Sequence, residues 1–174
     1  LMMLGMTGCA SQRYTVLEPA TRPFTDFTTL EIKDFTSNLS DEDSIDIAAQ
    51  FADRLHEAVM KEREDHPGES IFESVVRSTE DTNSVLVLDG TVISFEKGNQ
   101  FQRYMLGGVG GGKAYFTIQS VFSDKVMGEE IVKTNFDGEL GGGVFGGSWT
   151  EVIDGVVKAY IEYFDEYFEE RSVQ

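Results

Sequence analysis

Two long stretches of the chain carry apolar residues at helical spacing. In the first, which follows Ser40, one stripe recurs every three or four positions: Ile45, Ala48, Phe51, Ala52, Leu55 and Val59. In the second, which follows Ser148, the stripe is longer: Val152, Ile153, Val156, Val157, Tyr160, Ile161, Phe164 and Phe168. Serine is a favoured N-cap, because its hydroxyl accepts a hydrogen bond from a backbone N–H of the first turn. The spacing predicts two amphipathic helices, each with one apolar face that must be covered.

Five shorter stretches alternate between apolar and polar residues or are continuously apolar, which is typical of β-strands. They are residues 28–35, 71–76, 85–95, 113–123 and 129–136. The short turn at Asp124-Lys125 predicts that the last two form a hairpin. The order β-α-β-β-β-β-α predicts an α+β fold, a two-layer arrangement in which two helices pack on a mainly antiparallel sheet. We expect a single domain over residues 28–174.

The first nine residues have the pattern of the end of a signal peptide. Residues 1–8 are apolar or small and uncharged, and Cys9 follows Met6-Thr7-Gly8. Eight residues are too few to span a bilayer, which takes about 20, but they suit a signal h-region of about 7–15 residues. The spacing resembles the bacterial lipobox, with Met6 where Leu is usual. This resemblance implies that residues 1–8 are removed, that Cys9 carries lipid including palmitate, and that a charged segment precedes Leu1. The alternative is an incidental thiol in an N-terminal tail.

Residues 9–27 connect Cys9 to the first predicted strand. They contain Pro19 and Pro23 and show neither helical period nor clear alternation, which predicts an extended tether or edge segment. Ala10 follows the lipidated position, and by resemblance to enterobacterial sorting signals this favours the outer membrane, with the domain facing the periplasm.

Charge and composition narrow the range of functions. The 31 acidic and 14 basic residues give a net charge of −17, which repels nucleic acid and favours either solubility or a basic protein partner. His56 and His66 have no further ligands at zinc-site spacing, so we expect no metal and no cofactor. The acidic residues fall mostly at helix starts and on polar faces rather than in a reactive constellation. We therefore expect a protein that is not an enzyme.

Two glycine-rich segments, 107–112 and 141–147, invite a test for nucleotide binding. The first, with Lys113, has phosphate-loop spacing, but Ala114 replaces the required hydroxyl residue and a strand follows instead of a helix. The second fits the dinucleotide fingerprint, but no second parallel strand follows its helix. The favoured interpretation is loops that are mobile or closely packed. The alternative is an anion held by Arg103, Lys113 and Ser148, the last at a helix N-terminus.

From Val85 onward, the chain resembles a bacterial family called domain of unknown function 4410. The resemblance lies in Asp89-Gly90, in Arg103-Tyr104 before the first glycine segment, in the 124–128 hairpin and in the second glycine segment. The preceding strand and helix are loosely similar to α/β domains of envelope lipoproteins related to the curli-secretion pore. The family implies a secreted or lipid-anchored context but no catalytic residues.

These observations together predict a membrane-anchored bacterial envelope lipoprotein. We expect a non-catalytic binding or assembly role, with an envelope protein or further copies of the same chain as partner. The alternative is a domain that binds an anion or nucleotide through its glycine-rich loops.

Overall fold

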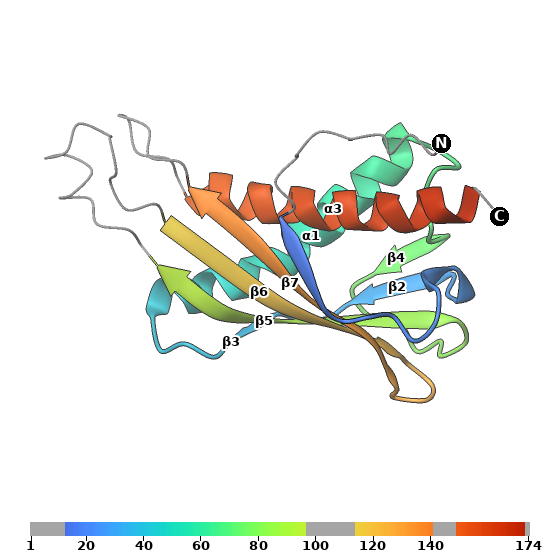
Figure 1. Ribbon diagram of the computed structural model, residues 1–174, viewed down its shortest axis with the longest axis horizontal. Helices are drawn as coiled ribbons and strands as arrows, with labels where there is room; N and C mark the ends of the chain where they lie inside the picture. Colours follow the sequence, from blue (N-terminus) through green and yellow to red (C-terminus); the bar gives the residue numbers. More distant parts are fainter. Residues whose placement is uncertain (1–12, 97–113, 141–148, 173–174) are drawn as a thin grey trace, which may run out of the picture.

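In the part of the chain that the structure describes, residues 13–96, 114–140 and 149–172 of a computed structural model, two long helices cover one face of a seven-stranded sheet (Figure 1). The elements in chain order are β1 (Tyr14–Glu18), the short 3-10 helix η1 (Phe24–Asp26), β2 (Thr29–Ile32), β3 (Thr36–Ser37), α1 (Glu42–Asp65), β4 (Ser74–Val76), β5 (Val85–Glu96), β6 (Ala114–Asp124), β7 (Glu130–Leu140) and α3 (Trp149–Ser172). The predicted two-layer α+β fold is confirmed.

The sheet is mixed, with an antiparallel part and a parallel part. Its strand order is β1-β7-β6-β5-β2-β4, and β3 pairs additionally with β5. The pairs β1–β7, β7–β6 and β6–β5 are antiparallel, whereas β2 runs parallel to both β4 and β5. Because β2 and β4 are parallel neighbours, the chain must cross over between them, and α1 is that crossover.

Helix α1 begins where local chemistry favours it. Asp41 is the N-cap, and its carboxylate accepts the backbone N–H groups of Asp43 at 3.1 Å and Ser44 at 3.3 Å. The buried stripe matches the predicted one from Ala48 to Val59 but differs in the first turns, where Ser44 and Ile47 are buried and Ile45 is not. Ile47 lies in the core, whereas Ile45 is 49 % exposed. The helical periodicity places Ile45 at the edge of the face that the later buried residues form.

The segment before β2 is part of the folded domain. Residues 14–18, which the sequence assigned to a tether or edge segment, form the edge strand β1 beside β7. Phe24, the first residue of η1, and Phe27, the residue that follows η1, are buried in the core. The domain therefore begins N-terminal to the expected boundary at residue 28, because backbone pairing and these two rings hold this segment on the sheet.

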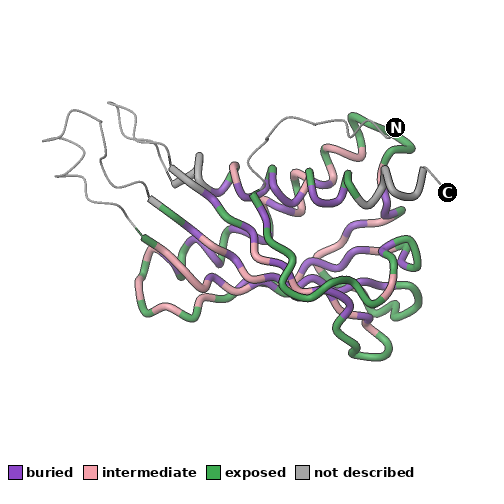
Figure 2. Tube along the Cα trace, in the orientation of Figure 1, coloured by how far each residue is buried: buried purple, intermediate pink, exposed green. Residues whose placement is uncertain are grey.

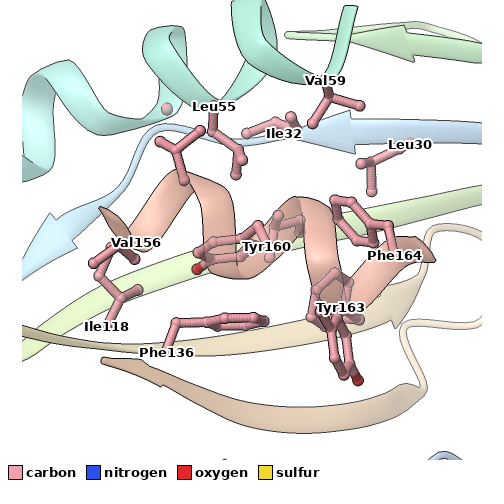
Figure 3. Close-up of a cluster of buried hydrophobic side chains, with 14 of the residues drawn as sticks. Leu30, Ile32, Leu55, Val59, Ile118, Phe136, Val156, Tyr160, Tyr163 and Phe164 are labelled. Atoms are coloured by element: carbon pink, nitrogen blue, oxygen red, sulfur yellow. The ribbon is translucent and has the colours of Figure 1, made fainter. Parts of the chain in front are cut away.

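The core between the helices and the sheet is rich in aromatic rings, and it lies in the buried layer of Figure 2. Tyr160 of α3 stacks on Phe136 of β7, with ring centroids 3.7 Å apart and an interplanar angle of 13° (Figure 3). The hydroxyl of Tyr160 is paired with Ser120, and the Thr134 hydroxyl donates to the Tyr163 hydroxyl at 3.3 Å. Burial raises the pKa of Tyr160. The hydroxyls of Tyr160 and Tyr163 therefore both have partners, which burial of a polar group requires.

Candidate functional site

The four site residues predicted from sequence are Cys9, Arg103, Lys113 and Ser148, and all lie outside the described residues. The two glycine-rich segments lie outside them as well. Among the described residues, no group of three or more His, Cys, Asp or Glu side chains is arranged to hold a metal ion. No helix within the described ranges is both long enough and apolar enough to cross a bilayer.

The β6–β7 hairpin presents two apolar side chains to solvent. Val126 is 61 % exposed and Met127 is 68 % exposed, more than any other large apolar side chain in the described part. Hairpin turns normally carry Gly, Asn, Asp or Ser, whose conformations and hydrogen bonds suit tight turns. We call Val126 and Met127 the hairpin tip, and we take it as the candidate interaction surface. Figure 1 shows that this hairpin projects beyond the ends of the neighbouring strands.

Asp124 fixes the conformation of the turn that carries the hairpin tip. Its carboxylate accepts the backbone N–H of Val126 at 2.8 Å and that of Met127 at 3.1 Å. The N–H of Gly128 donates to the Asp124 carbonyl at 2.8 Å, and Gly128 has a φ of +64°, which glycine adopts without strain. The hairpin tip is thus held by three hydrogen bonds to one residue.

Arg22, in the connection between β1 and β2, forms an ion pair with Asp124. Its Nη1 lies 2.7 Å from Oδ2 of Asp124, and its guanidinium lies 4.9 Å from the centroid of the Phe27 ring. Hydrogen bonds from the Met127 backbone and from Arg22 hold the pKa of Asp124 below its usual value. These interactions favour the ionised carboxylate, which accepts the hydrogen bonds of the turn.

A buried charge cluster fixes the next residue of the turn. The Glu31 side chain is fully buried, and Nζ of Lys125 lies 2.5 Å from its Oε2, while Lys33 pairs with its other oxygen. Lys125 also donates to the Thr79 carbonyl. Burial raises the pKa of Glu31, but its hydrogen bonds to Lys125 and Lys33 outweigh burial and hold the pKa below its usual value. Lys125 thus ties the hairpin to β2 and to the β4–β5 connection.

The face of the sheet away from the helices carries polar side chains that pair across strands. Thr117 donates to Asp137 at 2.7 Å, and Gln119 donates to Asn135 at 3.4 Å. Desolvation raises the pKa of Asp89 on this face, Glu31 adds to the rise and Lys33 opposes it. Paired polar groups of this kind are typical of a solvated surface. Val126 and Met127 of the hairpin tip are more exposed than the other large apolar side chains that the structure describes.

The sequence predicted the hairpin but not the exposure of the two apolar residues at its tip. The local signal was present, because Val126 and Met127 stand between Asp124 and Gly128, the residues that build the turn. The Glu31–Lys125 pair gave no such signal, since its two residues are 94 positions apart.

A family model described as Domain of unknown function (DUF4410) matches residues 24–141. The chain belongs to this family. The match includes β2, α1 and all of the β6–β7 hairpin. It therefore begins well upstream of Val85, the first residue of the resemblance described from the sequence. No curated protein sequence matches the chain significantly.

The chain is similar to solved structures at low sequence identity. A PelC dodecamer from Paraburkholderia phytofirmans has a TM-score of 0.52 and 12 % identity, with 84 % of this chain and 94 % of that chain covered. Lipoprotein GNA1162 from Neisseria meningitidis has a TM-score of 0.45 and 11 % identity, with 78 % and 96 % covered. At 12 % identity, the likeness to PelC shows a shared fold and nothing more.

Proposed function

We propose that this chain is a lipid-anchored protein of the bacterial envelope that docks onto an envelope protein or onto further copies of itself. Cys9 carries the lipid, and the outer membrane, with the domain facing the periplasm, is the expected address. The role is binding or assembly rather than catalysis. The observation that carries the docking role is the apolar hairpin tip, held in one conformation by Asp124 and Lys125.

A rigid apolar tip suits docking for two physical reasons. Burying apolar surface contributes about 25 cal/mol per Å², so covering Val126 and Met127 favours association. A surface that is already ordered loses little conformational entropy on binding, so less of the favourable free energy of apolar burial is offset. Met127 adds an unbranched side chain that adapts to the shape of the opposing surface. A protein with the same fold, PelC, was solved as a dodecamer, which supports self-association as one form of docking.

The anchor is tested on the precursor, expressed in a bacterium with a complete signal peptide and compared with Cys9→Ser. We expect a lipid-sized mass increase over a chain that begins at Cys9, together with partitioning into the membrane fraction. Both should disappear in Cys9→Ser and persist in the control Ser11→Ala. Unmodified, soluble protein in every case would contradict the anchor.

The docking role is tested with the double variant Val126→Ser with Met127→Ser. We expect chemical crosslinking in intact cells to give a discrete adduct for the wild type, whose mass identifies a second copy or a different protein. The adduct should be lost in the double variant and kept in Ile45→Ser, which removes another exposed apolar side chain from α1. An adduct that survives the double variant would show that the hairpin tip is not the docking surface.

A further inference from the structure

A cavity of about 280 Å³ opens between the end of α1 and the middle of α3, within the helix layer. Its apolar lining consists of Val59, Ile71, Phe72, Ile161 and Phe164. This volume lies near the lower end of the roughly 300–1,000 Å³ typical of ligand pockets, so a small organic group fits. An apolar recess of this kind favours an apolar guest.

The polar side chains around the cavity are three carboxylates, one guanidinium, one imidazole and the hydroxyl of Ser70. Carboxylates come from Glu62 of α1, Glu69 after it and Asp165 of α3. Arg63 is the cation of the lining, but its guanidinium donates to the Glu73 carbonyl and to the Met60 sulfur at 3.6 Å.

The one histidine of the lining does not reverse this balance. The His66 imidazole lies 3.4 Å from the Glu62 carboxylate and 3.9 Å from that of Glu69. Three carboxylates, one guanidinium and one imidazole therefore lie at the edge of the cavity. The edge of the cavity is net negative.

We propose that this cavity binds a small organic cation, an apolar group that carries an ammonium. The apolar part enters the recess, and the ammonium remains at the edge beside the carboxylates of Glu62, Glu69 and Asp165. Phe72 and Phe164 meet edge to face, with centroids 5.7 Å apart and an interplanar angle of 88°, and their rings suit an aromatic guest. A carboxylate of the same shape would be repelled. This site is separate from the hairpin tip and does not depend on the proposed docking role.

The test uses three probes of nearly equal size on the intact chain: 2-phenylethylammonium, 2-phenylethanol and 3-phenylpropionate. We expect calorimetry or NMR titration to give the ammonium a dissociation constant at least about tenfold lower than that of the alcohol, with the carboxylate weakest. Added salt should narrow the difference between ammonium and alcohol. Equal affinity for the ammonium and the alcohol, or no binding of the ammonium in the millimolar range, would overturn the proposal.

Two variants decide whether the cavity itself is responsible. Glu62→Gln with Asp165→Asn keeps the shape and removes two charges, so the preference for the ammonium should fall to about threefold or less. Ile161→Trp should fill the recess and remove binding of both the ammonium and the alcohol. Ile161 is only partly buried, so this change is compatible with folding.

The control is Glu57→Gln, which changes the charge of α1 at an exposed position outside the cavity. It should leave the preference unchanged. An equal loss in the control would assign the preference to the overall charge of −17 rather than to the cavity, and would overturn the site.

Discussion

The two faces of the sheet are stabilised by different interactions. On the helix-covered face, aromatic rings pack together, among them Phe116, Phe122 and Phe136, all fully buried. The opposite face carries polar cross-strand pairs and a charge cluster in which the buried Glu31 pairs with Lys33 and Lys125. We expect the two faces to differ in their tasks: ring packing should supply most of the stability, and the charge cluster should fix where the β6–β7 hairpin lies.

The largest effect is expected on the helix-covered face. Phe136→Ala removes a fully buried ring that stacks on Tyr160, and it should lower the free energy of unfolding by roughly 3–5 kcal/mol. Tyr115→Ala, an exposed aromatic residue on the neighbouring strand, should cost under about 1 kcal/mol. Urea denaturation of both variants measures the difference. Equal losses would contradict the assignment of stability to ring packing.

A smaller effect is expected from the charge cluster. Glu31→Gln removes the charge that Lys125 and Lys33 share, and leaves Lys125 largely buried without its counter-ion, so it should cost about 1.5–3 kcal/mol. Hydrogen exchange of the hairpin amides should speed up more than that of the β6–β7 centre. The control Glu130→Gln, at a half-exposed ion pair with Lys133, should cost at most about 0.5 kcal/mol. Unchanged hairpin exchange in Glu31→Gln would remove the positioning role.

The pH dependence of stability should reflect Glu31 and Asp124, whose pKa values are lowered in the folded protein. Such groups contribute stability that is present above their unfolded pKa and lost as the pH falls through their folded pKa. The free energy of unfolding should therefore fall as the pH drops below the usual glutamate value of 4.5. Asp89, with its raised pKa, acts in the opposite direction.

Denaturation between about pH 7 and about pH 3 measures this profile. Glu31→Gln should flatten part of it. A wild-type profile already as flat as that of the variant would rule out the contribution of Glu31.

The smallest effect on stability is expected at the hairpin tip. Val126 and Met127 are exposed, so replacing both with Ser should change the free energy of unfolding by less than about 0.5 kcal/mol each. Thermal unfolding of the double variant checks this. A larger loss would mean that the tip is packed against the domain and is not a free surface.

The sequence predicted both helices and five strands because their apolar periodicity is long and regular. It did not predict β3, which is only two residues long. Nor did it show that β1 pairs with β7, because that pairing joins residues 14–18 to residues 133–136, far apart in sequence, through backbone hydrogen bonds. Gly90 is a similar case. A Cβ there would lie 2.2 Å from the Phe35 ring, so glycine is required by a contact with a residue far away in sequence.

The candidate site was less predictable than the fold. The residues singled out from motifs, Cys9, Arg103, Lys113 and Ser148, fall outside the described ranges. The hairpin tip lies in a turn whose sequence is ordinary except for its two apolar residues. Its supports, Arg22 and Glu31, lie about a hundred residues away, and only the folded sheet brings them to Asp124 and Lys125.

The most direct test of the account places a photo-crosslinking amino acid at position 127 of the membrane-anchored protein in living cells, with position 45 as the matched exposed control. We predict a discrete, reproducible adduct from position 127 and none from position 45, with mass spectrometry assigning it to a second copy or to one envelope protein. No adduct from position 127, or the same adducts from both positions, would contradict docking through the hairpin tip.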